Sequence, residues 1–308
     1  MRSLETKLGR VTLRNPILGA SGCCGYGYEL AGYVDLGRYG GLSLKTFTAE
    51  PRIGNRPERI AEVASGILNS IGLQNPGKDV FFSDVMPQVL SVLDREQIIV
   101  SIGGNTIEDY AELCREVADR FGDQIAAIEI NAACPNVNHG AGYYSRDPKA
   151  AYALVHAVRN AAELPVFMKF NTNFPNYLEV ASAIEEAGAD ALYTTNTPLG
   201  LKVNIKTRKP AIGNERGPIC GPAIRPIGVL RTWDLYKTVR IPIVSSGGVC
   251  TWEDALEYMM AGATAVGVGS FQFSVPNAVE KILNGLEQYL ERENIESISS
   301  LIGVAHKQ

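Results

Sequence analysis

The sequence predicts an α/β protein built on a (β/α)8 TIM barrel, and three observations support that prediction. Short apolar runs of β type alternate with longer helical patterns along almost the whole chain, which is the order expected of βα units around a parallel sheet. There are eight such runs. The length of 308 residues suits one α/β barrel that carries insertions, so we expect a single domain over residues 1–308.

The predicted elements follow one another in regular order. The eight predicted strands cover residues 16–21, 41–48, 98–104, 126–133, 165–171, 189–196, 241–247 and 265–269. The predicted helices mostly have apolar residues at i, i+3 and i+4 spacing, and they cover residues 107–121, 148–162, 177–187, 227–238, 251–261 and 276–293.

Two segments depart from a minimal barrel. The segment before Asn15 is expected to form a hairpin that closes the barrel floor. Residues 198–222 contain four glycines and four prolines, which makes the stretch too irregular for a helix and too long for a plain connection. We therefore expect an inserted functional loop at the carboxyl-terminal face of the strands.

A doubly wound open sheet is the main alternative fold. Such a sheet needs a G-x-G-x-x-G turn after its first strand to bind a dinucleotide. The corresponding segment here, Cys23-Cys-Gly-Tyr-Gly27, does not match that pattern. The barrel is therefore favoured.

The composition points to small-molecule chemistry. Hydrophobic residues make up 45% of the chain and charged residues 20%, as in a protein with a large core, and the net charge is −4 without any Lys/Arg run. This charge gives no electrostatic reason to expect binding to nucleic acid or to an anionic membrane. There is no signal-peptide pattern and no long apolar run, so we expect a cytoplasmic protein.

The cysteines and histidines do not predict a metal centre. None of the six cysteines forms a C-x-x-C pair, and the three histidines are scattered. We therefore expect no metal site here. An iron-sulfur cluster that took electrons from this protein would have to be bound by another chain.

Polar and glycine residues follow the predicted strands, at the end where barrels place their active sites. The most informative segment is 126–136, an apolar strand that leads into Asn131, Cys134 and Asn136. A thiol between two carboxamides suggests a site that binds a polar ligand and moves a proton. The other strand ends supply Ala20, Ser21, Lys45, Thr46, Ser101, Lys169, Asn196, Thr197, Gly247, Gly248, Gly269 and Ser270.

The glycines after the last two strands predict a phosphate site. Gly247-Gly248 and Gly269-Ser270 allow backbone N–H groups to approach an anion, and Thr251 is a candidate N-cap of the next helix. The ligand could be a flavin mononucleotide, with Lys169 near the N1/O2 edge of its ring, or a sugar phosphate. These residues alone leave both possibilities open.

Longer motifs indicate a family. They are Asn15-Pro-Ile, Ala20-Ser-Gly-Cys-Cys-Gly-Tyr-Gly27, Lys45-Thr, Glu50-Pro-Arg-Ile-Gly-Asn55, Asn69-Ser-Ile-Gly-Leu-Gln-Asn-Pro-Gly77, Cys134-Pro-Asn-Val137, Asn196-Thr, Gly221-Pro-Ala and Ser246-Gly-Gly-Val249. With them the chain resembles class 1 dihydroorotate dehydrogenases from its start to about residue 300, and it is most similar to the NAD-linked class 1B catalytic subunits.

The resemblance implies FMN-dependent oxidation of (S)-dihydroorotate to orotate in pyrimidine biosynthesis, with Cys134 as the base. It also implies a homodimeric core inside a heterotetramer, whose second subunit carries FAD and an iron-sulfur cluster and passes electrons to NAD. The implied substrate contacts are Lys45, Asn69, Ile71, Gly72, Leu73, Asn131, Asn136, Asn196 and Thr197. The implied FMN contacts are Ala20, Ser21, Lys45, Thr46, Ser101, Asn131, Lys169, Thr195, Gly221, Gly247, Gly248, Gly269 and Ser270.

Four positions depart from the family pattern near the expected flavin and base. Ala133 and Cys220 replace serines, Ser101 replaces an asparagine, and Thr195 replaces an apolar residue. These changes leave open a related FMN oxidoreductase that acts on another dihydropyrimidine or an activated alkene. A non-catalytic or sugar-phosphate-binding barrel is the alternative from a different functional class.

Overall fold

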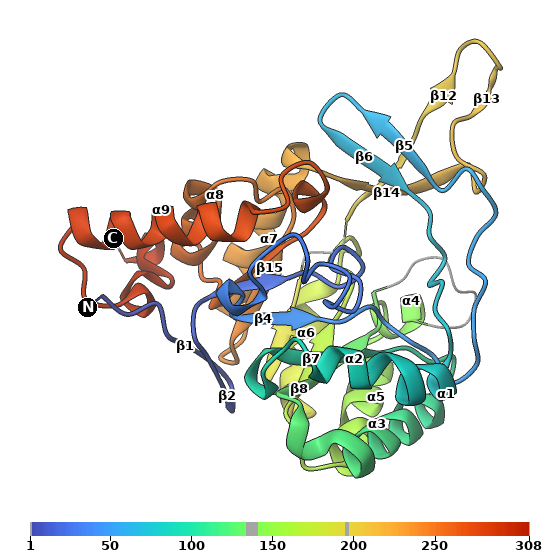
Figure 1. Cartoon of the computed structure of the whole chain (residues 1–308), viewed down its shortest axis with the longest axis horizontal. Helices are drawn as coiled ribbons and strands as arrows, with labels where there is room; N and C mark the ends of the chain where they lie inside the picture. Colours follow the sequence, from blue (N-terminus) through green and yellow to red (C-terminus); the bar gives the residue numbers. More distant parts are fainter. Residues whose placement is uncertain (1, 134–140, 195–196, 308) are drawn as a thin grey trace.

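The computed structural model describes residues 2–133, 141–194 and 197–307. Its core is a closed barrel of eight parallel strands that lie in chain order around it, and helices lie outside the strands (Figure 1). They are β3 (Ile17–Gly19), β4 (Gly41–Ser43), β7 (Ile98–Ile102), β8 (Ala127–Asn131), β9 (Val166–Lys169), β10 (Ala191–Tyr193), β15 (Ile243–Ser246) and β16 (Ala265–Val268). The barrel closes where Val266 of β16 pairs with Ile17 of β3. This confirms the predicted (β/α)8 fold, and each predicted strand contains an observed one.

In the part of the chain that the structure describes, six long helices surround the barrel, and each begins and ends within two residues of its predicted position. They are α3 (Ile107–Phe121), α5 (Pro148–Ala161), α6 (Tyr177–Glu186), α7 (Arg225–Thr238), α8 (Trp252–Met260) and α9 (Ala278–Arg292). The described residues also contain three short α-helices that the sequence patterns did not predict, α1 (Lys78–Val80), α2 (Met86–Leu90) and α4 (Ala141–Tyr144). Within the described ranges, no helix has both the length and the apolar character needed to cross a membrane.

Side-chain caps explain why two of these helices begin where they do. The Thr106 hydroxyl accepts a hydrogen bond from the backbone N–H of Asp109 at the start of α3. Thr251 makes the same contact with Asp254 at the start of α8, which confirms its prediction as an N-cap. Each cap satisfies a backbone donor that has no partner within its helix.

The predicted N-terminal hairpin is also confirmed. Strands β1 (Thr6–Leu8) and β2 (Val11–Leu13) pair antiparallel. Leu8 and Leu13 are buried in one cluster with Phe167 and other barrel residues. The hairpin therefore closes one end of the barrel with apolar side chains and leaves the opposite rim for chemistry.

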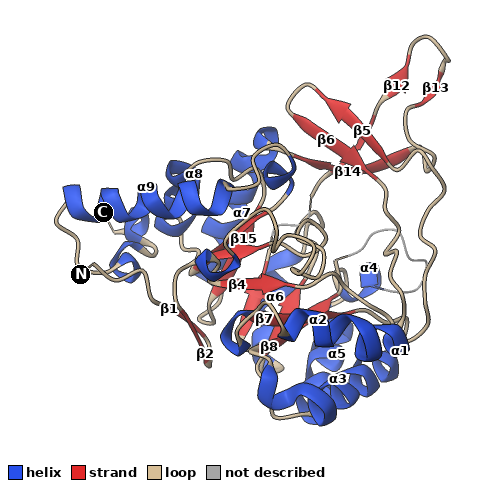
Figure 2. Cartoon of the chain, in the orientation of Figure 1, coloured by secondary structure: helices blue, strands red, loops and turns tan. Residues whose placement is uncertain are grey.

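A second sheet stands away from the barrel (Figure 2). Its order is β11 (Leu199–Leu201), β14 (Arg216–Cys220), β6 (Gly66–Asn69) and β5 (Ile60–Val63), and a small hairpin of β12 (Val203–Asn204) and β13 (Lys209–Pro210) extends beyond it. The expected insertion at 198–222 thus contains strands that pair with the loop after β4. Gly66 permits this pairing because a Cβ there would collide with the carbonyl oxygen of Cys220.

Candidate active site

The carboxyl ends of the barrel strands bring most of the predicted site residues to one rim. Residue pairing in the sheet sets their order, as where Asn131 of β8 lies opposite Lys169 of β9. Four predicted residues, Cys134, Asn136, Thr195 and Asn196, lie outside the described residues.

A row of hydrogen bonds joins three strand ends at this rim. The Asn131 amide nitrogen donates to the Thr46 hydroxyl at 2.8 Å, and the Thr46 and Ser101 hydroxyl oxygens are 2.8 Å apart. The Ser101 hydroxyl donates to a carboxylate oxygen of Glu129 at 2.8 Å. The Ser21 hydroxyl donates to the Leu44 carbonyl and lies 3.5 Å from Thr46. The predicted residues Ser21, Thr46, Ser101 and Asn131 therefore form one polar cluster, to which the structure adds Glu129.

Two lysines lie close to this cluster, around Cys23. Burial raises the pKa of the Cys23 thiol, while the positive charges of Lys169 and Lys45 act to lower it. The Lys169 ammonium also lies 5.2 Å from the centre of the Tyr193 ring. A Cβ added at Gly269 would be 3.5 Å from the Cys23 sulfur. The lysines and the loop after β16 therefore border the same part of the rim.

The Asn69 segment reaches the barrel rim through Cys220. The Asn69 amide nitrogen lies 3.4 Å from the Cys220 sulfur. Burial raises the pKa of the Cys220 thiol to about 12, and Lys169 acts to lower it. Asn69 belongs to the second sheet, but through Cys220 it lies in the same part of the site as Lys169.

Two residues in the loop that follows Asn69 have positive φ values. Gly72 and Leu73 have φ values of 75° and 54°, and Leu73 is not a glycine. The Ile71 carbonyl accepts a hydrogen bond from the Asn55 N–H at 3.0 Å. The backbone carbonyl of Thr197 accepts a hydrogen bond from the side-chain amide of Asn173 at 3.2 Å.

Three predicted glycines meet at the end of β15. Gly221, Gly247 and Gly248 have φ values of 127°, 119° and 73°, a region that favours glycine. A Cβ on Gly248 would lie 2.8 Å from the Gly221 carbonyl oxygen. The Tyr258 hydroxyl donates to the Gly247 carbonyl at 2.8 Å. This close packing of backbone resembles the loops with which barrels bind phosphate.

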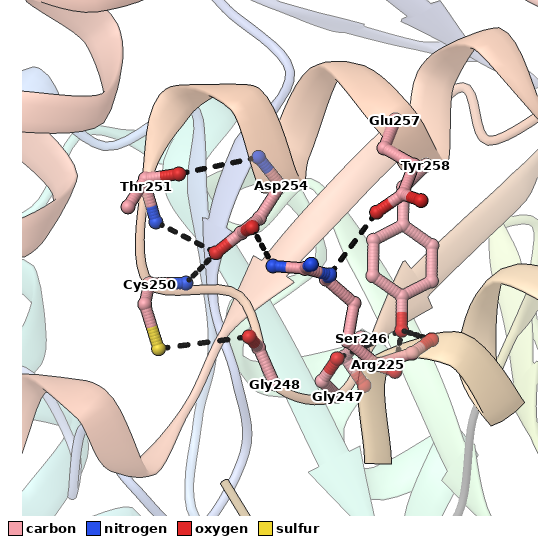
Figure 3. Close-up of polar contacts among 9 residues, drawn as sticks. All are labelled: Arg225, Ser246, Gly247, Gly248, Cys250, Thr251, Asp254, Glu257 and Tyr258. Atoms are coloured by element: carbon pink, nitrogen blue, oxygen red, sulfur yellow. Dashed lines mark hydrogen bonds and ion pairs between the residues drawn. The ribbon is translucent and has the colours of Figure 1, made fainter. Parts of the chain in front are cut away.

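An ion pair that the sequence analysis missed supports the glycine loop. Figure 3 shows the Arg225 guanidinium between the carboxylates of Asp254 and Glu257. One oxygen of Asp254 also accepts from the backbone N–H groups of Cys250 and Thr251, at 2.9 and 3.0 Å. Asp254 therefore fixes the chain just after Gly248. The capping-box spacing of Thr251 and Asp254 was the only signal in the sequence for this role.

The comparisons with known proteins agree with this geometry. The model of the family described as dihydroorotate dehydrogenase matches residues 3–290. A protein of Carboxydothermus hydrogenoformans, named dihydroorotate dehydrogenase B (NAD(+)), catalytic subunit, is 43% identical over 305 residues, which cover 99% of this chain and 98% of the relative. A protein of the same name from Enterococcus faecalis is 40% identical over 299 residues, which cover 97% and 95% of the two chains.

A solved structure supports the fold. The crystal structure of DHODH in complex with ferulenol from Eimeria tenella matches with a TM-score of 0.79 at 22% identity, and the match covers 99% of this chain and 89% of that one. The family model and the two relatives extend over nearly the whole chain, and they confirm what the sequence motifs indicated: this chain belongs to the dihydroorotate dehydrogenase family.

Proposed function

We propose that this chain is the catalytic subunit of an NAD-linked dihydroorotate dehydrogenase and oxidises (S)-dihydroorotate to orotate in pyrimidine biosynthesis. The observation that carries the proposal is the rim itself, where the Asn131–Thr46–Ser101 hydrogen bonds, two lysines and the glycine loop lie together. Its relatives over the full length are named as catalytic subunits of the NAD(+)-linked enzyme.

The substrate proposal follows from the donors and acceptors at the rim. Dihydroorotate carries a carboxylate, two ring N–H groups and two carbonyls, so its site needs a cation together with groups that both donate and accept. Lys45 would bind the carboxylate. Carboxamides and backbone groups would bind the ring, and the proposed set is Asn69, Ile71, Gly72, Leu73, Asn131, Asn136, Asn196 and Thr197.

The cofactor proposal follows from the glycine loop. Family membership implies a flavin, and we propose FMN because Gly247 and Gly248 follow β15, where barrels commonly bind a phosphate, and Gly248 packs against the Gly221 carbonyl oxygen. Bound FMN would supply the hydride acceptor. The phosphate would lie against Gly247, Gly248, Gly269 and Ser270. The remaining proposed contacts are Ala20, Ser21, Lys45, Thr46, Ser101, Asn131, Thr195 and Gly221, with Lys169 near the N1/O2 edge.

We propose Cys134 as the base that removes the proton from C5 of dihydroorotate. General-base catalysis is typically worth about 10²–10⁴-fold in rate. Three other cysteines are poorly suited to this role, because burial raises the pKa values of Cys24, Cys114 and Cys220 to about 12. At neutral pH such thiols stay protonated and cannot accept a proton.

The partner proposal completes the electron path. A second subunit with FAD and an iron-sulfur cluster would take electrons from this chain and deliver them to NAD, and two copies of this chain would form the core of a heterotetramer. The chain contains no C-x-x-C pair, which supports the assignment of the cluster to a partner.

A substrate panel distinguishes the proposed function from that of a related FMN oxidoreductase that acts on another dihydropyrimidine. The purified protein, reconstituted with FMN, is given dihydroorotate, dihydrouracil and dihydrothymine with an artificial electron acceptor. Turnover of dihydroorotate at least about a hundredfold faster than of the other two is the expected result, because only dihydroorotate offers a carboxylate to Lys45. Turnover of the other two compounds without turnover of dihydroorotate would contradict the proposal.

A further inference from the structure

Glu129 is a buried carboxylate in the middle of an apolar barrel strand. It has no exposed surface, and its two oxygens accept hydrogen bonds from two serine hydroxyls, Ser101 at 2.8 Å and Ser43. The pairing of β7 with β8 places Ser101 directly opposite Glu129. A buried carboxylate is costly without such donors, and the proposed chemistry of the rim makes no direct use of it.

These contacts set the direction of the hydrogen bonds that lead to the rim. A serine hydroxyl has one hydrogen, and that of Ser101 is donated to Glu129. In the 2.8 Å contact between Thr46 and Ser101, Thr46 must therefore be the donor. The Thr46 oxygen is then left to accept from the Asn131 amide nitrogen at 2.8 Å. Every hydrogen in the row points toward Glu129.

The direction of the row decides which end of the Asn131 carboxamide faces Thr46. With its nitrogen toward Thr46, Asn131 also accepts from the Ala133 backbone N–H at 3.3 Å. A flipped amide would place its oxygen against the Thr46 oxygen, whose hydrogen is already donated to Ser101. An amide has two N–H groups and two oxygen lone pairs, so, among the contacts of the described residues, these two leave one of each for ligands.

We propose that Glu129 is a positioning residue, which fixes the orientation of the Asn131 carboxamide through the hydroxyls of Ser101 and Thr46. Ser101 and Thr46 are buried, with exposures of 0% and 1%, whereas Asn131 is partly exposed. Glu129 therefore acts on ligands through Asn131, and Ser101, itself a proposed FMN contact, links Glu129 to Thr46 and Asn131. The inference rests on the proposed function in that Asn131 is a proposed contact of both substrate and flavin.

Ser43 provides a matched control. Ser43 and Ser101 are both fully buried serines, and each donates to one oxygen of the same carboxylate. Ser101→Ala cuts the row that leads to Asn131, whereas Ser43→Ala removes a comparable hydrogen bond outside that row. Glu129→Gln offers one accepting oxygen and one donating nitrogen, so the direction of the row is no longer fixed.

The experiment measures two dissociation constants for each variant. The dissociation constant of orotate is taken from the change in the flavin absorption spectrum, without turnover, and that of FMN from titration of the apoprotein. Both should be weakened at least about tenfold by Ser101→Ala, less by Glu129→Gln, and under about twofold by Ser43→Ala. The KM for dihydroorotate should rise in the same order, with a smaller change in kcat.

Three outcomes would overturn the inference: equal losses of affinity in Ser43→Ala and Ser101→Ala, wild-type affinity in Ser101→Ala, or wild-type affinity in Glu129→Gln. A merely structural role for the carboxylate would affect the two serine variants alike. If the wild-type protein binds FMN but not orotate, the proposed function fails. The FMN dissociation constant of Glu129→Gln then still decides the role of Glu129, because Glu129 is not itself a proposed contact of FMN.

Discussion

Arg225 and Asp254 form an ion pair that joins the start of α7 to the first turn of α8. The Asp254 side chain is 8% exposed and that of Arg225 34%. Because Asp254 also holds the backbone N–H groups of Cys250 and Thr251, this pair ties two helices to the segment that follows Gly248.

Asp254→Asn should therefore weaken FMN binding, although Asp254 is not itself a proposed contact of FMN. Hydrogen bonds to a charged group are worth about 1.5–3 kcal/mol, so we expect the FMN dissociation constant to rise about tenfold or more, as measured by titration of the apoprotein. The matched control is Glu293→Gln, which breaks the exposed Arg292–Glu293 pair and should change stability by less than about 1 kcal/mol. Equal FMN affinity in Asp254→Asn and wild type would refute the role of the pair.

Gly248→Ala tests the glycine loop itself. The variant places a Cβ 2.8 Å from the Gly221 carbonyl oxygen at a φ of +73°, and strain of this kind costs about 1–3 kcal/mol. We expect a loss of FMN affinity of about fivefold to a hundredfold. Gly122→Ala is the control, because a Cβ there meets nothing within 4 Å. Similar FMN affinities in the two variants would show that the loop does not bind the cofactor.

Cys134→Ala should separate catalysis from binding. The variant is expected to keep its flavin and its affinity for orotate, and to lose about 10²–10⁴-fold in dihydroorotate oxidation through loss of the base. Steady-state kinetics with an artificial electron acceptor provide the measurement. Cys114→Ala, in the buried core, should retain wild-type turnover. A fully active Cys134→Ala protein would mean that another group removes the proton.

Because the buried Cys114 thiol has a raised pKa, it makes the free energy of unfolding depend on pH. Burial raises its pKa from 9.0 to about 12. Below pH 9 the thiol is neutral in both states, and its contribution to stability is fully present. Between pH 9 and 12 the unfolded chain loses a proton that the folded chain keeps, so the free energy of unfolding falls by up to about 1.4 kcal/mol per pH unit.

Cys114→Ala should remove that contribution. Denaturant unfolding of both proteins at pH 7 gives the packing cost of the substitution, and the same measurement at pH 9.5 and 10.5 gives the slope against pH. The variant should lose stability less steeply than the wild type above pH 9. Parallel slopes for the two proteins would contradict the raised pKa.

Local patterns were sufficient to predict the barrel. The helix at Ile107–Phe121 has the bounds that its periodicity predicts, because apolar spacing and a capping threonine are both local signals. The second sheet could not be found in this way. Its strands are short and mostly half-buried, and it brings together residues as distant as Asn69 and Cys220, 151 positions apart.

The sequence was sufficient to predict which residues lie at the strand ends, but not which of them contact one another. Asn131, Lys169 and the glycines follow apolar runs, so their place at the strand ends could be predicted. Ser101 reaches Glu129 because of the pairing of β7 with β8, and Arg225 reaches Asp254 because α7 and α8 are neighbours. Such contacts depend on strand register and helix packing, which no single segment of sequence specifies.

The most direct test of the proposed function is anaerobic reduction of the flavin by substrate. Dihydroorotate is added without oxygen to the FMN-loaded protein, and the visible absorption of the oxidised flavin is followed in a stopped-flow instrument. We predict rapid bleaching, with one equivalent of orotate formed per flavin. A flavin that stays oxidised with dihydroorotate, in protein that dithionite reduces normally, would contradict the proposed function.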